Sequence, residues 1–304
     1  MKNSPSITIA IPSYNKASYL CRCIDSALKN MEAGVDIILV DNASSDATYA
    51  IAKSYEPNIT CYQNDSNIGM ASNWNKCIEH ATGDWILILH ADDELVPDVI
   101  PLYRSMIAKY PDLGIIHANS FGVTNGNIAT MTITATTHKE HWHAGAEALD
   151  APIGLCSTVM VKKEAYEKLG NFISTSLSAD GEMWPRIASR YDLAFINTPT
   201  AIYHSNESST GTHSLIERRF EDIVADWDNL TEQTANAYPT EALRQEYLTR
   251  TKKDAVGNYW AIISANIKAR KYRNVVRAVW IISVHYKELL PFMRLVIVKI
   301  WNKL

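Results

Sequence analysis

The sequence predicts an α/β protein in which a mixed, mainly parallel, Rossmann-like sheet is flanked by helices and followed by a helical C-terminal extension. Within the first 95 residues, short β-branched segments alternate with segments of helical spacing. This alternation is typical of a parallel sheet with right-handed crossovers. Residues 85–89 are apolar throughout, as expected of a strand that is covered on both faces.

The first two strand–helix pairs have clear boundaries. Residues 6–11 are short and β-branched and are stopped by Pro12, and residues 17–29 carry apolar side chains at helical spacing. Residues 35–40 form the second predicted strand. The Ser-Ser-Asp sequence that follows offers N-cap oxygens for a helix over 48–55.

The remaining elements follow the same reasoning. Residues 59–63 are the third strand, and a turn at 67–69 leads into a helix over 71–80. Further along, residues 154–169 indicate a strand and then a helix, closed by Gly170 as a C-cap. A further strand is expected over 193–202.

Polar side chains follow each of the first four predicted strands. They are Ser13, Tyr14 and Asn15, then Asp41 and Asn42, then Asn64 and Asp65, and finally Asp92 and Asp93. The carboxyl ends of parallel strands meet at one sheet edge, where ligands bind in open α/β sheets. We therefore expect a nucleotide pocket there, in which Asp41 accepts a hydrogen bond from the N3–H of a uracil and Tyr14 stacks on the base.

The acidic cluster after residue 89 suits a cation. Asp92, Asp93 and Glu94 offer the oxygen ligands that Mg²⁺ or Mn²⁺ prefers when it carries a phosphate, although a solvated acidic turn is the alternative. No GxGxxG follows the first strand and no GxxxxGK[ST] occurs, so dehydrogenase and P-loop interpretations lose their support. Without such a loop, a metal on Asp92 and Asp93 would have to meet the charge of a diphosphate.

Six segments in order resemble family 2 glycosyltransferases of the GT-A fold, and the resemblance covers roughly residues 5–210. The segments are Ile-Pro-Ser-Tyr-Asn at 11–15, Val-Asp-Asn-Ala-Ser-Ser-Asp at 40–46, Asn-Ile-Gly at 67–69, Asn-Trp-Asn at 73–75, Gly-Asp at 83–84 and His-Ala-Asp-Asp at 90–93.

The resemblance implies a role for each matching residue. Pro12, Tyr14 and Asn15 would line the base and Asp41 would read it; Asn67, Asn73 and Asp92 would lie near the ribose and sugar. Asp92 or Asp93 would meet the Mn²⁺ or Mg²⁺ ion. The sequence departs from the family at His90, which replaces the first Asp of the DxD motif, although imidazole also ligates Mn²⁺.

Residues 178–187 are similar to the family's Glu-Asp-x-x-x-Trp-x-Arg motif. The resemblance implies that Asp180, at the head of a helix, deprotonates the acceptor hydroxyl on the face opposite the leaving UDP. The preceding Glu of the motif is Ala179 here, and Glu182 is a partial replacement. The alternative role for Asp180 is a helix N-cap.

Two segments contain histidines that are candidate metal ligands. Family members often carry a His near the diphosphate or metal at the position of His204, so His204 is a predicted ligand, with a structural role as the alternative. Residues 138–143 contain His141 and His143 only two apart with no further ligand evident, so this tract is interpreted as a solvated loop near the acceptor.

Composition and charge indicate the surroundings of the protein. Five scattered cysteines favour a reducing cytoplasm, and the N-terminus shows no signal peptide. The net charge of −4 divides unevenly, because residues 268–304 hold nine Lys or Arg against Glu288 alone. Apolar and basic residues alternate at helical spacing over 287–304, which predicts an interfacial helix on an anionic membrane. Packing on the catalytic domain or on a second copy in a homo-oligomer is the alternative. The acidic body argues against nucleic acid.

These features together predict a catalytic domain over 1–215, with a nucleotide-binding half (1–95) and an acceptor half (96–215), and a helical region over 216–304. The expected activity is inverting transfer of a hexosyl or N-acetylhexosaminyl group from a UDP-sugar to a hydroxyl of a lipid-linked saccharide or oligosaccharide. It would take place on the inner face of the cell membrane, in polysaccharide biosynthesis. A non-catalytic relative that keeps the nucleotide pocket is the alternative. A nucleotidyltransferase would need a basic Gly-rich loop after the first strand, which is missing.

Overall fold

The computed structural model describes residues 4–124, 127–131, 139–151, 154–174, 179–204, 220–268, 275–276 and 278–279 of the 304-residue chain. The chain divides into two compact units. The first comprises Met1–Asn206 with Ala237–Pro239, and the second comprises Glu207–Asn236 with Thr240–Leu304.

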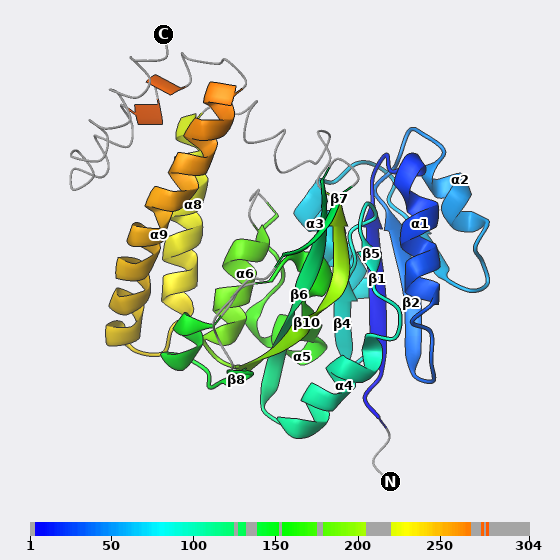
Figure 1. The fold of residues 1–304 in the computed structure, drawn as a ribbon, viewed down its shortest axis with the longest axis horizontal. Helices are drawn as coiled ribbons and strands as arrows, with labels where there is room; N and C mark the ends of the chain where they lie inside the picture. The colour runs from blue at the N-terminus through cyan, green and yellow to red at the C-terminus, as the bar shows by residue number, and fades with distance from the viewer. Residues whose placement is uncertain are drawn as a thin grey trace. The chain divides into compact units, whose positions relative to one another are not determined.

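The first unit is built on one mixed sheet, shown in Figure 1, whose main strand order is β3-β2-β1-β4-β9-β6-β10-β5. Its first four strands are parallel, whereas β9 and β5 are antiparallel to their neighbours. This confirms the predicted α/β class. The strands are β1 (Ile7–Ser13), β2 (Val35–Asp41), β3 (Thr60–Gln63), β4 (Trp85–Ile88), β5 (Glu94–Leu95), β6 (Leu113–Thr124), β7 (Asn127–Met131), β8 (His141–Trp142), β9 (Met160–Lys162) and β10 (Asp192–His204).

Helices cover both faces of the sheet. One apolar cluster joins β1 residues such as Ile9 to α1 (Ala17–Leu28), α2 (Thr48–Lys53) and α4 (Ile100–Lys109). The other joins the opposite side of the strands, beginning with Ala10, to α3 (Met70–His80), α5 (Lys163–Leu169) and α6 (Ala179–Ala188). Because successive side chains of a strand point to opposite faces, an uninterrupted apolar strand serves both clusters. Each fully buried isoleucine contributes about 1.5–3 kcal/mol.

Pro12 lies in the central strand β1. Its missing N–H costs no hydrogen bond to a neighbouring strand, because pairing with β4 has already ended. Pairing of β1 with β4 ends at Ala10, which pairs with Ile88. The Ala10 carbonyl accepts a last bond from the N–H of Leu89. Backbone polar groups of alternate residues point to the same neighbouring strand, so Pro12 faces the side where pairing has stopped.

The segment between the two halves contains elements that the sequence did not predict. Strand β5, helix α4 and the hairpin of β6 and β7 all fall between residues 94 and 131. The expectation of a solvated loop over 138–143 is wrong for His141 and Trp142, which form strand β8 and pair with the start of β10. Two short 3₁₀ turns, Glu147–Asp150 and Cys156–Thr158, precede β9.

Two long helices follow the sheet, α8 (Phe220–Ala237) and α9 (Glu241–Lys268). They lie within residues 216–304, where the sequence predicted a helical region. Arg244 of α9 forms an ion pair with Glu232 of α8 at 2.9 Å. No described helix combines the length and the hydrophobicity needed to cross a bilayer. The predicted amphipathic tail over 287–304 lies outside the described residues.

Candidate active site

The carboxyl ends of the first strands meet as the sequence predicted. Ser13, Asp41 and Gln63 are register partners across β1, β2 and β3. The Ser13 hydroxyl lies 3.4 Å from the Asp41 carboxylate, and the Gln63 amide donates to the same carboxylate at 3.0 Å. Strand ends that are distant in sequence therefore share one polar edge.

Asp41 is fully buried at this edge. Besides Gln63, its carboxylate accepts from the Ser44 N–H at 2.9 Å and from the Ser44 hydroxyl at 2.5 Å. A carboxylate has about four acceptor positions, and these contacts with the long Ser13 contact occupy them. An incoming base N–H would therefore have to displace one of these donors, and the longest contact, to Ser13, is the weakest.

The corner between β1 and α1 is held in an uncommon backbone conformation. Asn15 has φ 51° and Ala43, at the end of β2, has φ 57°. The Asn15 side chain accepts from the Ser45 N–H at 2.9 Å, which ties the two corners together. Each such residue costs on the order of 1–3 kcal/mol and persists only where surrounding contacts enforce it. The result is that Tyr14 stays 44% exposed at the edge, available for stacking.

The predicted residues Asn67 and Asn73 belong to an amide network under the loop that follows β3. Asn73 is buried and donates to the Val40 carbonyl at 3.0 Å, while Asn64 donates to Asn73 at 2.8 Å. Asn42 donates to Asn67 at 2.9 Å. Asn73 thus holds the ends of β2 and β3 in place, and its amide is already hydrogen-bonded to Val40 and Asn64.

Asp92 forms an ion pair with Lys16, whose ammonium lies 2.6 Å from the carboxylate. Burial alone would raise the pKa of Asp92, but the hydrogen bond and charge of Lys16, helped by His90, outweigh it and hold the pKa below its usual range. Asp92 is therefore ionised, and its cationic partner Lys16 carries no signal in the sequence that would have revealed it.

Asp93 and His204 are held by other partners. The buried Asp93 carboxylate accepts from the Ser157 hydroxyl at 2.6 Å and from the His204 N–H at 3.2 Å, and burial raises its pKa. The His204 ring lies 2.7 Å from Glu94, which also pairs with Arg22 at 2.9 Å. The predicted ligands Asp92, Asp93 and His204 are thus brought to one edge, each with its own partner in this state.

The donor set at this edge fits a divalent cation. The Nε2 atom of His90 is buried without a hydrogen-bond partner among the described residues, and its ring stacks on Trp74 with centroids 5.1 Å apart. The charge of His90 acts on the pKa of both Asp92 and Asp93, so the three groups are neighbours. An unpartnered imidazole nitrogen beside an ionised carboxylate is a set that Mn²⁺ accepts.

Asp180 lies in the first turn of α6. Burial raises the pKa of the Cys156 thiol, and the next largest causes are the charges of Asp180 and Asp93. Both carboxylates therefore lie close to Cys156. The predicted base and one carboxylate of the acidic cluster thus act on the same buried thiol.

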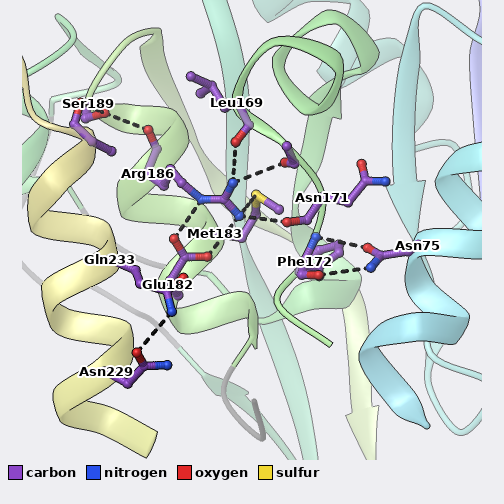
Figure 2. A network of polar contacts seen from close by, with 12 residues as sticks. Asn75, Leu169, Asn171, Phe172, Glu182, Met183, Arg186, Ser189, Asn229 and Gln233 are labelled. Carbon is purple, nitrogen blue, oxygen red and sulfur yellow. Dashed lines mark hydrogen bonds and ion pairs between the residues drawn. The ribbon is translucent and has the colours of Figure 1, made fainter. Parts of the chain in front are cut away.

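Glu182 has a structural role. It is fully buried and forms a two-point ion pair with Arg186, at 2.6 and 2.9 Å (Figure 2). Arg186 also donates to the carbonyls of Leu169 and Asn171 at the end of α5. The Arg of the recognised motif thus fixes α6 against α5, and Glu182 is committed to that contact.

Helix α3 is joined to the same region through Asn75 and Trp74. Asn75 exchanges two hydrogen bonds of 2.9 Å with the backbone of Phe172 (Figure 2). Edge-to-face contacts run from Trp74 to Phe172 and from Phe172 to Trp184 of α6, with centroids 5.1 and 5.6 Å apart. A buried aromatic row therefore couples His90, through Trp74, to the helix that carries Asp180.

The comparisons with known proteins identify the family of the chain. The family model described as "Glycosyl transferase family 2" matches residues 8–170. The chain belongs to this family. Uncharacterized protein MT1568 of Mycobacterium tuberculosis is 36% identical over 242 residues, which are 71% of this chain and 72% of that protein. Putative glycosyltransferase EpsE of Bacillus subtilis is 27% identical over 222 residues, 69% and 76% of the two chains.

Solved structures share the fold, which is of the GT-A type. The structure of S. aureus TarS residues 1–349 in complex with UDP-GlcNAc superposes with a TM-score of 0.74 at 15% identity, covering 90% of this chain and 79% of that one. The mannosyltransferase PcManGT from Pyrobaculum calidifontis, in complex with GDP-Man and Mn²⁺, gives a TM-score of 0.53 at 17% identity and covers 95% and 88%. At these identities the likeness concerns the fold alone.

Proposed function

We propose that this glycosyltransferase moves a hexosyl or N-acetylhexosaminyl group from a UDP-sugar to a saccharide hydroxyl with inversion at the anomeric carbon. The observation that carries the proposal is the shared polar edge of Ser13, Asp41 and Gln63 at the ends of β1, β2 and β3, where a donor would lie. The UDP-GlcNAc complex of S. aureus TarS and the GDP-Man and Mn²⁺ complex of PcManGT support a nucleotide-sugar donor.

In the proposed reaction the Asp180 carboxylate takes the proton of the acceptor hydroxyl. The hydroxyl oxygen forms a bond to the anomeric carbon from the face opposite the diphosphate. The bond from that carbon to the phosphate oxygen breaks, and its electron pair stays on the departing UDP. The acceptor thus gains the sugar, and Asp180 carries the proton until solvent removes it.

The leaving diphosphate needs positive charge. Lys16 and Arg22 border the acidic cluster, and they supply cationic donors within this chain. A Mn²⁺ or Mg²⁺ ion held by Asp92, with His90 and Asp93 beside it, would neutralise the charge that develops on the diphosphate. Tyr14 and Asp41 would hold the base, and the choice of uracil rests on the acceptor role of Asp41.

The acceptor class is proposed from the charge of the tail. Residues 268–304 carry nine Lys or Arg and one acidic residue, which suits a surface of anionic lipid. A protein held on the inner face of the cell membrane would meet lipid-linked saccharides there. This part of the proposal concerns residues almost entirely outside those that the structure describes.

The experiment is a panel of nucleotide-sugars incubated with the purified full-length protein, with and without Mn²⁺, in which nucleotide release is measured. We expect UDP release from one UDP-sugar, stimulated by metal. Release from GDP- or dTDP-sugars alone would overturn the assignment of uracil. Binding of UDP-sugars without any turnover, also in the presence of oligosaccharide acceptors, would favour the non-catalytic alternative, which the replacements at His90 and Ala179 make worth testing.

A further inference from the structure

A group of potential metal ligands lies in the first unit, in a part of it that the proposed reaction does not use. His141 and His143 are two residues apart at strand β8, so they share one face of it. Asp192 opens β10, which pairs with β8 through Leu193 and Trp142. The ligand atoms of His141, His143 and Asp192 all lie within 4.8 Å of one another. We call these three residues the His–Asp cluster.

The geometry of the His–Asp cluster is close to that of a metal site. His141 Nε2 lies 2.9 Å and His143 Nδ1 lies 3.1 Å from the same Asp192 oxygen, Oδ2. Ligand atoms around a tetrahedral Zn²⁺, at bond lengths of about 2.0–2.1 Å, lie roughly 3.3 Å apart. A cation could therefore enter with small side-chain movements.

Neighbouring groups orient each ligand. The other Asp192 oxygen accepts from the Ala144 N–H at 2.9 Å, which leaves Oδ2 for the imidazoles. Glu147 accepts from the backbone N–H of His143 at 2.6 Å, which holds the main chain at that residue. The Tyr110 ring stacks on His141 with centroids 4.2 Å apart and planes 4° from parallel. Supporting contacts of this kind fix ligands in known metal sites.

We propose that the His–Asp cluster binds a divalent transition-metal ion, with Zn²⁺ the best fit. Two imidazoles and one carboxylate leave a fourth position for water, and the 74% exposed side chain of His143 places that position toward solvent. Nitrogen ligands favour Zn²⁺, Ni²⁺ or Cu²⁺ over Mn²⁺, and Mg²⁺ prefers oxygen alone. A hydrogen-bonded His–Asp group without metal is the competing explanation.

This site is separate from the candidate active site. Strand β10 begins at Asp192 and ends at His204, whose N–H bonds to Asp93. At about 3.3 Å per residue these ends are on the order of 35–40 Å apart. A bound ion would therefore act on structure, by tying the segment around β8 more firmly to the start of β10, with which it already pairs at Leu193 and Ala194.

The test is calorimetric titration of the full-length protein with Zn²⁺ in the absence of nucleotide. A Cys21→Ser background removes the exposed thiol that would compete for Zn²⁺. We expect one Zn²⁺ per chain at this site, and an affinity lowered at least about tenfold by either His143→Gln or Asp192→Asn. Asp92→Asn and the matched control His80→Gln should leave that binding unchanged, which separates this ion from one at the active site.

The His143→Gln variant keeps the test decisive if Asp192→Asn fails to fold, because His143 is the most exposed member of the cluster. Co²⁺ gives an independent reading, since its visible absorption reports coordination by nitrogen ligands and should weaken in the same variant. If Zn²⁺ does not bind, or if His143→Gln binds it with the affinity and stoichiometry of the parent, the cluster is a hydrogen-bonded group and the proposal is wrong.

Discussion

At the residue scale, the carboxylates of the candidate site have the same chemistry but different partners and different burial. Asp41 is engaged by neutral donors, Asp92 by a lysine, and Glu182 by an arginine. The buried Asp93 has a hydroxyl and a backbone N–H for partners. Of these five carboxylates, Asp180 alone combines the head of a helix with partial exposure, as a base needs to reach an acceptor.

Replacing the proposed base should stop transfer without releasing the donor. In Asp180→Asn the amide cannot take the acceptor proton, so we expect turnover to fall on the order of 10²–10⁴-fold. UDP affinity should stay within a few-fold, because Asp180 belongs to the acceptor half. Rates and UDP binding measured on the same preparation check both parts. Near-normal turnover would place the base elsewhere, and Glu182 is already committed to Arg186.

A second residue-scale prediction concerns pH. Burial lowers the pKa of His117 to about 3 from its ordinary value of 6.5, and its Nδ1 accepts from the Gly154 N–H at 2.7 Å. Between these values the unfolded chain binds the proton and the folded protein does not. Stability is therefore complete above pH 6.5 and falls as the pH drops toward 3, by up to about 1.4 kcal/mol per unit for this group.

The variant His117→Gln, whose amide oxygen can accept the same bond, should lose this dependence. Urea unfolding of both proteins at pH 7 and pH 5 measures it, since other titrating groups are common to the two. The stability difference between wild type and variant should shrink as the pH falls. An unchanged difference would show that His117 does not stay neutral in the folded protein.

The positions of many candidate site residues could be predicted, because the motif segments fix which side chains follow which strand. Tyr14 and Asp41 follow neighbouring strands, and Asp92 follows the fourth predicted strand, as the sequence indicates. Lys16, which pairs with Asp92, and Ser157, which donates to Asp93, could not be predicted, because such contacts depend on long-range packing that no local pattern records.

At the element scale, a strand could be predicted from the sequence where its run of apolar residues is long and uninterrupted. Strands β1, β2 and β4 are almost wholly buried and bounded by turn residues, so their positions were predictable. Strand β6 is interrupted by polar residues such as His117 and Asn119, which are buried inside the sheet. Strand β8 has only two residues and depends on pairing with β10.

The contact between α5 and α6 should depend on the Arg186–Glu182 ion pair. In Arg186→Met the Glu182 carboxylate remains fully buried without its partner, which typically costs about 3–5 kcal/mol. Urea unfolding of this variant, of Glu182→Gln and of the double variant measures the coupling. We expect the double variant to lose less stability than the sum of the single variants. Strict additivity would contradict a direct interaction.

At the scale of the whole molecule, the two units carry different proposed roles. The first holds the candidate nucleotide and acceptor edge, and the second carries the basic tail. The family and the fold of the first unit followed from ordered motifs. The role of the tail rests on charge and periodicity alone, because its helix over 287–304 lies outside the described residues.

Removing residues 271–304 should release the protein from anionic liposomes while UDP binding survives. Each basic residue near an anionic surface contributes about 1 kcal/mol. Co-sedimentation with anionic and with neutral vesicles measures the effect, and Lys299→Ser with Lys303→Ser gives a milder variant that keeps the apolar residues. Full-length protein that ignores anionic vesicles would instead make the tail a packing or dimerisation element.

The central claim is that the strand ends form a UDP site that works with a divalent cation. Calorimetric titration of UDP into the full-length protein, with and without Mn²⁺, tests it most directly when Asp92→Asn is measured in parallel. We predict that Mn²⁺ tightens UDP binding to the wild type and that Asp92→Asn loses this gain. Equal UDP affinity with and without Mn²⁺ in the wild type would remove the cation from the account, and tighter binding of GDP than of UDP would contradict the role given to Asp41.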